Sequence, residues 1–342
     1  MPSTARVTTA SQTRTLIGWQ GIRFVLPSDW NLTGFSIEPH GGYLKVDSPG
    51  TMFAQIRWTD RAAPKPRTLF DYTLHALRRI RLLRAATPPE PELRAVLEAF
   101  LTDTRKQARK SKGAFEYRIK PWVQEAGGMR QAHHFSWSAG DQGQGKIWRC
   151  SYCGRTVIAQ VVGRQRDDVA QTAAGLFSSM VDHPEDGWTT WALYDFVGAA
   201  PEDFRLVRHK LMSGYLLLEL ERPGERLRLE RWGLANVALK KFTLAEWFRQ
   251  VCAPPVAAQE DGLTRNGHPS VEARGTPANL LRRAALWFRS GASLRPALWY
   301  SGCAWACPQS NRIYAVQLWR PGRNPDLLDE VADRCECHGS RS

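Results

Sequence analysis

The stretch WQGIRFVLPSDWNL at residues 19–32 is similar to a later stretch, WALYDFVGAAPEDFRL, at residues 191–206. Both stretches carry Trp, Phe, Pro, Asp, an aromatic residue and Leu in that order. Each is followed by Gly-Tyr-Leu, at 42–44 and 214–216, then by Pro-Gly, and then by Trp58 or Trp232. Because chance rarely preserves such an order, the sequence predicts a tandem duplication.

The end of each copy repeats a second set of landmarks at identical spacing. In the first copy these are Trp148, Cys150, Arg155 and Gln160, and in the second they are Trp305, Cys307, Arg312 and Gln317. The chain of 342 residues is long enough for two domains. We therefore expect a flexible N-terminus at 1–14, a first repeat at 15–185 and a second repeat at 186–342.

The hydrophobic patterns predict an α+β fold. Residues 21–26 alternate as a strand, and strands at 42–47 and 52–58 flank a turn at 48–50. The period at 69–83 is helical, and further helices are expected at 90–110 and 168–180. Further strands are expected at 115–122, 129–138, 146–150 and 156–162, and in the second copy at 191–196, 215–220, 227–232, near 298 and at 313–318, with helices at 244–251 and 326–334. This element order predicts two α/β/α sandwiches, each a mostly antiparallel sheet covered by helices.

Residues 21–30, Gly-Ile-Arg-Phe-Val-Leu-Pro-Ser-Asp-Trp, resemble the opening of the PsbP-like and DcrB-like family, in which a short strand runs into Phe-x-x-Pro-x-x-Trp. The resemblance implies an α/β/α sandwich used for binding and assembly, without a shared catalytic set. The second copy departs from the pattern: two extra residues separate Phe196 from Pro201, and Phe204 replaces the Trp.

The formal net charge of +14 indicates attraction to an anionic partner. Basic residues cluster in the predicted helices of the first copy, and we call this set the basic face. It comprises Arg78, Arg81, Arg84, Arg105, Lys106, Arg109 and Lys110. The leading hypothesis is a non-enzymatic binding or assembly protein, an accessory subunit that docks on an acidic protein partner through this face. The alternative is a nucleic-acid-binding protein that uses the same surface.

The seven cysteines form an odd set in a chain too long to need disulfide bonds, which favours a reducing cytoplasm. Cys150 and Cys153 have the spacing of a zinc knuckle, since two thiolates on a tight turn can hold one tetrahedral ion. Zinc is the one cofactor that the sequence suggests, which leaves a zinc-binding protein as a further alternative. The competing interpretation is that Cys150 and Cys307 pack in the core beside Trp148 and Trp305.

Other local motifs favour structure over chemistry. Residues 140–146 match the sequence pattern of a phosphate-binding loop, but Ile147 stands in place of the Ser or Thr that would hold magnesium. A hairpin turn explains the glycines. His133 and His134 lie in a predicted strand and so point to opposite faces. The sequence contains no recognised nucleophile or metalloprotease motif, which disfavours an enzyme. It also contains no stretch of eighteen apolar residues, so we expect no membrane span.

Overall fold

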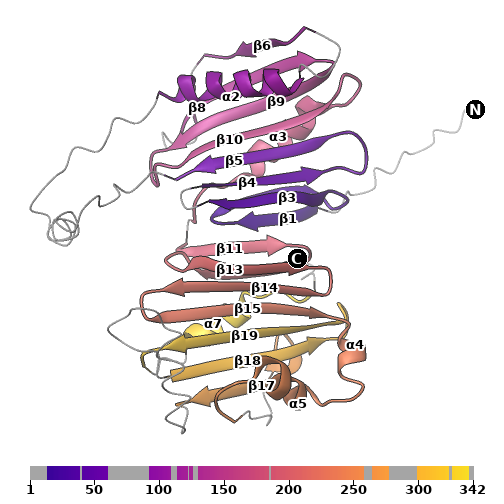
Figure 1. Cartoon of the computed structure of the whole chain (residues 1–342), viewed down its shortest axis with the longest axis vertical. Coiled ribbons are helices and arrows are strands. Elements are labelled where there is room, and N and C mark those ends of the chain that lie inside the picture. The colour runs from indigo at the N-terminus through magenta and orange to yellow at the C-terminus, as the bar shows by residue number, and fades with distance from the viewer. Residues whose placement is uncertain are drawn as a thin grey trace, which may run out of the picture. The chain divides into compact units, whose positions relative to one another are not determined.

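The computed structural model describes residues 14–38, 41–60, 92–108, 114–121, 123–125, 130–184, 186–257, 264–276, 299–322 and 326–338. These residues form three antiparallel sheets with helices packed on them, an α+β arrangement (Figure 1). Contacts divide the chain into two compact units. Unit 1 comprises residues 1–15 and 24–182, and unit 2 comprises residues 16–23 and 183–342. The predicted helix at 69–83 lies outside the described residues.

Unit 1 is built around an antiparallel sheet in which two strands far apart in the sequence pair near the centre. Its strand order is β3 (Asn31–Glu38), β4 (Gly41–Asp47), β5 (Phe53–Thr59), β10 (Thr156–Arg164), β9 (Asp141–Cys150), β8 (Arg130–Ala139) and β6 (Glu116–Ile119). A short strand, β7 (Val123–Glu125), also pairs with β8. Side-chain burial alternates along β5, as expected for a strand that packs different surroundings on its two faces.

Two helices cover opposite faces of this sheet. In α2 (Leu93–Ala108), which lies over the sheet in Figure 1, Leu93, Leu97 and Leu101 recur every four residues. These leucines pack on Phe135 and other apolar side chains of the sheet. The next helix, α3 (Val169–Ser179), begins after Asp168, whose carboxylate accepts a hydrogen bond from the Gln171 amide.

The helix α3 lies on the face away from α2. His134 precedes Phe135 in β8, so its ring points to the other side of the sheet, where it contacts Phe177 of α3 at 6.4 Å between ring centroids. The prediction that His133 and His134 lie in a strand is confirmed. The α3 bounds also match the predicted helix at 168–180 within one residue at each end.

The glycines in residues 140–146 do not form the turn that the sequence suggested. The turn is limited to Gly140, whose φ of 86° is left-handed, and β9 already begins at Asp141. Gly143 and Gly145 lie within β9, where a Cβ atom would come 2.2 Å from the indole of Trp137 and 2.0 Å from the ring of Phe135. The glycines therefore make room for two aromatic rings on the α2 face.

The sheet of unit 2 repeats the strand order of unit 1. Its order is β13 (Arg205–Met212), β14 (Tyr215–Arg222), β15 (Glu225–Gly233), β19 (Arg312–Arg320), β18 (Trp299–Cys307), β17 (His268–Gly275) and β16 (Thr264–Arg265). The central hairpins also share their register. Trp148 pairs with Val157 in unit 1, and Trp305 pairs with Tyr314 in unit 2, both at an offset of 157 residues (305 − 148 and 314 − 157).

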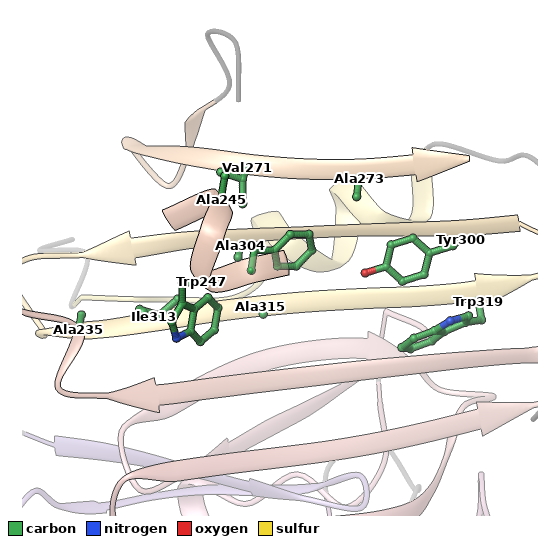
Figure 2. Close-up of a cluster of buried hydrophobic side chains, with 11 residues drawn as sticks. Ala235, Ala245, Trp247, Val271, Ala273, Tyr300, Ala304, Ile313, Ala315 and Trp319 are labelled. Atoms are coloured by element: carbon green, nitrogen blue, oxygen red, sulfur yellow. The ribbon is translucent and has the colours of Figure 1, made fainter. Parts of the chain in front are cut away.

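Helices also cover the sheet of unit 2. They are α4 (Ala235–Ala238), α5 (Leu244–Trp247), the π-helix η2 (Phe248–Cys252) and α7 (Asp326–Asp333). The helix predicted at 244–251 is thus a single α-helical turn, closed at its start by a capping box between Thr243 and Glu246, followed by a π-helix. Figure 2 shows Trp247 near Ile313 on the sheet, and Tyr300 contacting Trp319 further along the same face.

A smaller sheet has the order β12 (Phe196–Pro201), β11 (Trp188–Leu193), β1 (Arg14–Trp19) and β2 (Ile22–Pro27). Within unit 2, Gly18 pairs with Ala192, and Trp19 meets Trp191 edge to face at 5.2 Å. The single strand predicted at 191–196 is wrong: Tyr194 and Asp195 have φ values of 48° and 61° and turn the chain between β11 and β12.

The alignment of Trp58 with Trp232 is one residue out of register. Trp58 pairs with Val157 in unit 1. The residue of unit 2 that corresponds to Val157 is Tyr314, and Tyr314 pairs with Arg231 and not with Trp232. Trp232 therefore points to the opposite face from the one that Trp58 occupies in its own unit. There it packs against Trp247 at 5.8 Å between ring centroids.

Candidate functional site

The described part of the basic face lies on α2. Arg105 and Lys106 are exposed in the last turn of the helix, where cations interact favourably with the helix dipole, and Lys106 also binds Asp103 at 3.0 Å. The remaining members of the face lie outside the described residues: Arg78, Arg81, Arg84, Arg109 and Lys110. The structure therefore shows two of the seven predicted docking residues on one exposed helix face.

The positive charge belongs mainly to the first half of the chain. Residues 1–182 contain 26 Lys and Arg against 15 Asp and Glu, whereas residues 183–342 contain 21 against 18. In unit 2, many of the arginines on the sheet are neutralised by cross-strand carboxylates, as in the contacts of Arg228 with Glu219 at 2.8 Å and of Arg222 with Glu225 at 2.7 Å. An anionic partner would accordingly be attracted to the first half.

The predicted thiol pair of unit 1 is brought together by a tight turn at the end of β9. The Cys150 carbonyl accepts a hydrogen bond from the Gly154 amide at 2.9 Å, and the Sγ atoms of Cys150 and Cys153 lie within 4.8 Å of each other. Cys150 is fully buried, as expected for a core residue beside Trp148, whereas Cys153 is exposed. A ring nitrogen of His183 lies within the same distance of both thiols, so the pair and His183 together supply three possible ligands of the four that a structural zinc ion takes.

A cavity of about 180 Å³ lies between α2 and the sheet of unit 1. At its wall, the Arg57 guanidinium sits over the rings of Tyr43 and Phe100, at 5.4 Å and 5.8 Å from their centroids. The Trp137 indole N–H donates to Gln160 at 3.0 Å, and the Gln160 amide donates to a neighbouring glutamine. The indole and the two glutamine side chains therefore satisfy one another within the cavity wall.

Unit 2 contains a similar chain of hydrogen bonds that ends on a buried carboxylate. Tyr300 donates to Gln317 at 3.0 Å, Gln317 donates to Glu230 at 2.7 Å, and Tyr215 donates to the second oxygen of Glu230 at 2.6 Å. Burial, followed by the nearby Glu230 charge, raises the pKa of the Tyr215 hydroxyl. The hydroxyl therefore remains a hydrogen-bond donor to the carboxylate at neutral pH.

A second group of possible metal ligands lies in unit 2, and we call it the four-ligand cluster. Its members are His268, Cys307, Cys337 and His338, whose ligating atoms all lie within 4.8 Å of one another. The Nδ1 atom of His338 is 3.4 Å from His268 Nε2, 3.5 Å from Cys307 Sγ and 3.1 Å from Cys337 Sγ. Burial and the neighbouring Cys307 thiol raise the pKa of Cys337 to about 11 when no ion is bound.

Sequence reasoning missed this cluster because its members come from three distant segments. His268 begins β17, Cys307 ends β18, and the other two follow α7. The signal in the sequence was the adjacent Cys337-His338 pair, but neither of the other ligands lies within the spacing of a common zinc motif. Only the pairing of β17 with β18 brings them together.

No protein-family model and no curated protein sequence matches this chain. Over about half its length the chain is structurally similar to the solution structure of cyanobacterial PsbP (CyanoP) from Synechocystis sp. PCC 6803. The sequence identity is 14%, the TM-score is 0.33, and the match covers 54% of this chain and 99% of that chain. Among the described residues, no helix has both the length and the apolar character needed to cross a membrane.

Proposed function

We propose that this chain is a non-enzymatic binding or assembly protein, an accessory subunit that docks on an acidic protein partner through the basic face. The observation that carries the proposal is the uneven charge: an excess of 11 basic residues (26 − 15) in residues 1–182 against 3 (21 − 18) in residues 183–342. An acidic partner would be steered toward the first half by this field.

The orientation of α2 supports the same face. The buried stripe of Leu93, Leu97 and Leu101 holds the helix on the sheet, which leaves Arg105 and Lys106 on the solvent side. Within the described part of the chain, Arg105 forms no ion pair, so its charge is not neutralised by the neighbouring helix residues. The sequence continues from this turn into Arg109 and Lys110, which extend the run of positive charge.

A protein partner is favoured over nucleic acid because the aromatic residues near α2 pack against other rings. Single-stranded nucleic acid is bound by exposed rings on which bases stack. Here Phe100 contacts Phe135 at 5.9 Å, and Phe115 stacks on Trp137 at 5.7 Å, so both rings are engaged in packing. Nucleic acid remains the second candidate because phosphates alone can be held by lysine and arginine.

We also propose that the two units arose by tandem duplication and that each is a PsbP-like α/β/α sandwich. The matching strand orders and the common register of the β9–β10 and β18–β19 hairpins support this interpretation. Two repeats of one binding fold would give an assembly protein two related surfaces, of which only the first carries the large positive charge. A cytoplasmic location is part of the same proposal.

The test is affinity isolation of the tagged full chain from its own cells at moderate salt, with and without nuclease. We expect a stoichiometric protein partner that survives nuclease treatment and is lost when Arg105, Lys106, Arg109 and Lys110 are all changed to Glu. A matched control places the same four charge reversals at exposed positions of unit 2: Arg205, Arg208, Lys240 and Lys241.

The control variant should retain the partner. Retention of the partner by the variant of the basic face would refute docking through that face. Recovery of nuclease-sensitive nucleic acid alone, with an affinity that falls linearly in log–log form as salt rises, would favour the second candidate.

A further inference from the structure

We propose that the four-ligand cluster of unit 2 binds one Zn²⁺ ion in a closed tetrahedral site. The first argument is the convergence of three groups on one atom. A neutral imidazole nitrogen that carries no hydrogen has a single lone pair, so His338 Nδ1 can accept one good hydrogen bond. Three partners within 3.5 Å of it are better explained by a shared cation than by hydrogen bonds.

The second argument is the size of the cluster. Zinc bond lengths of about 2.0–2.1 Å to nitrogen and about 2.3 Å to sulfur place tetrahedral ligands at about 3.4 Å for N···N and about 3.6 Å for N···S. The observed separations are 3.4 Å between the two histidine nitrogens, and 3.5 Å and 3.1 Å from His338 Nδ1 to the sulfurs of Cys307 and Cys337. The ligands thus already stand close to the spacing that the ion requires.

The third argument is that rigid structure positions the ligands. Ser270 pairs with Trp305, and His268 and Cys307 each lie two residues further in the same direction along β17 and β18, so the pairing of the two strands sets them beside each other. His268 is 7% exposed and Cys307 is fully buried. Their positions are therefore set by the sheet and not by a mobile surface loop.

The segment after α7 brings the other two ligands to this point. The Tyr314 hydroxyl donates to the Cys337 carbonyl at 3.3 Å, and the Asn266 amide donates to the Cys335 carbonyl at 2.8 Å. The helix α7 is itself fastened to the sheet by Asp329, which binds both Arg265 and Arg274. These contacts hold Cys337 and His338 over the ends of β17 and β18.

The ligand set selects the metal and its role. Two thiolates and two imidazoles in tetrahedral array suit Zn²⁺, and four protein ligands leave no open position for water or substrate. The site is therefore structural: it ties the segment after α7 to the sheet of unit 2. In unit 1, Cys150 occupies the place of Cys307 and lies near Cys153 and His183, but its partner in β8 is Arg130. Among the described residues, that group therefore has three possible ligands and lacks the fourth, which β17 supplies in unit 2.

The experiment measures metal content in the full chain. Purified protein should retain one zinc per chain by elemental analysis, and replacement by Co²⁺ should give thiolate-to-cobalt charge-transfer absorption with the visible bands of a tetrahedral ion. Cys337→Ser should abolish both signals. The matched control, Cys150→Ser with Cys153→Ser, should keep both.

A second variant tests the site in case Cys337→Ser fails to fold. Because His338 is exposed, His338→Asn should fold, bind zinc at least tenfold more weakly and shift the cobalt bands. The assignment would be overturned if the native chain failed to retain zinc or to take up Co²⁺, or if it retained copper in place of zinc. It would also be overturned if the Cys150/Cys153 variant lost its metal while Cys337→Ser kept it. Unchanged cobalt bands in His338→Asn would do the same.

Discussion

Replacement of Gln317 by Leu tests whether the buried hydrogen-bond chain of unit 2 depends on its carboxylate. Gln317 is fully buried and joins the Tyr300 hydroxyl to Glu230. The corresponding residue of unit 1, Gln160, joins two neutral groups, the Trp137 indole and the Gln55 amide. The same substitution at Gln160 is therefore a matched control that differs mainly in charge.

The two substitutions should differ in cost by about 2 kcal/mol. Gln317→Leu removes the donor from one oxygen of Glu230, which is 5% exposed, and the acceptor from the fully buried Tyr300 hydroxyl. A lost hydrogen bond to a charged group costs about 1.5–3 kcal/mol and an unsatisfied neutral group about 1–3 kcal/mol, so we expect about 3–5 kcal/mol in total. Gln160→Leu should cost about 1–2 kcal/mol because only neutral groups lose their partners and water can reach the half-buried Gln55.

Hydrogen exchange read by mass spectrometry separates the two units, which a single denaturation curve does not. Protection of the β18–β19 hairpin should fall about 100-fold or more in Gln317→Leu, and protection of β9–β10 about tenfold in Gln160→Leu. Adding Glu230→Gln to Gln317→Leu should restore part of the loss, because it removes a buried charge that has lost one of its two hydrogen-bond donors. Equal losses in the two single variants, or no recovery in the double variant, would refute the reasoning.

Three further predictions concern stability. Leu97→Ala should lower the free energy of unfolding of unit 1 by about 2–5 kcal/mol, measured by hydrogen exchange of its sheet, because it opens a cavity under α2. A change below about 1 kcal/mol would contradict the packing described. Gly145→Ala should destabilise the protein by about 1–3 kcal/mol, because the added Cβ collides with Phe135. Gly175→Ala in α3 should stabilise it by about 0.5–1 kcal/mol, because a Cβ there meets nothing within 4 Å. Both effects are measured as shifts in the thermal midpoint. Burial raises the pKa of the Cys303 thiol to about 12, so the unfolded chain loses that proton first and stability should fall as pH rises above about 8.5. Thermal midpoints of Cys303→Ala should show a shallower decline between pH 8.5 and 11, and parallel curves would count against the assignment.

The docking proposal and the zinc proposal are independent of each other. Docking on an acidic partner depends on charges of unit 1, whereas the zinc site depends on ligands of unit 2. Loss of zinc in the Cys337→Ser variant with an intact partner complex would leave the docking proposal standing. Equally, a chain that binds no partner would still be expected to retain its zinc.

The α+β class and most elements were predictable from the sequence because they depend on local periodicity. Alternation of apolar residues located β4 and β5, and the helical stretch predicted at 90–110 contains α2, since each pattern matches the repeat of its own backbone. The turn at Tyr194 and Asp195 was missed because both residues adopt positive φ without a glycine to mark the position.

The sequence by itself determined the order of landmarks, the element types and the concentration of positive charge, because these follow from the residues within each segment. Strand register and side-chain assembly were decided only by the tertiary structure. A slip of one residue reverses the face of a strand, and this separated Trp58 from Trp232 despite their matching positions in the sequence. A metal site requires ligands within a few ångströms, and only the folding of β17, β18 and the segment after α7 onto one another brings His268 to Cys307, Cys337 and His338.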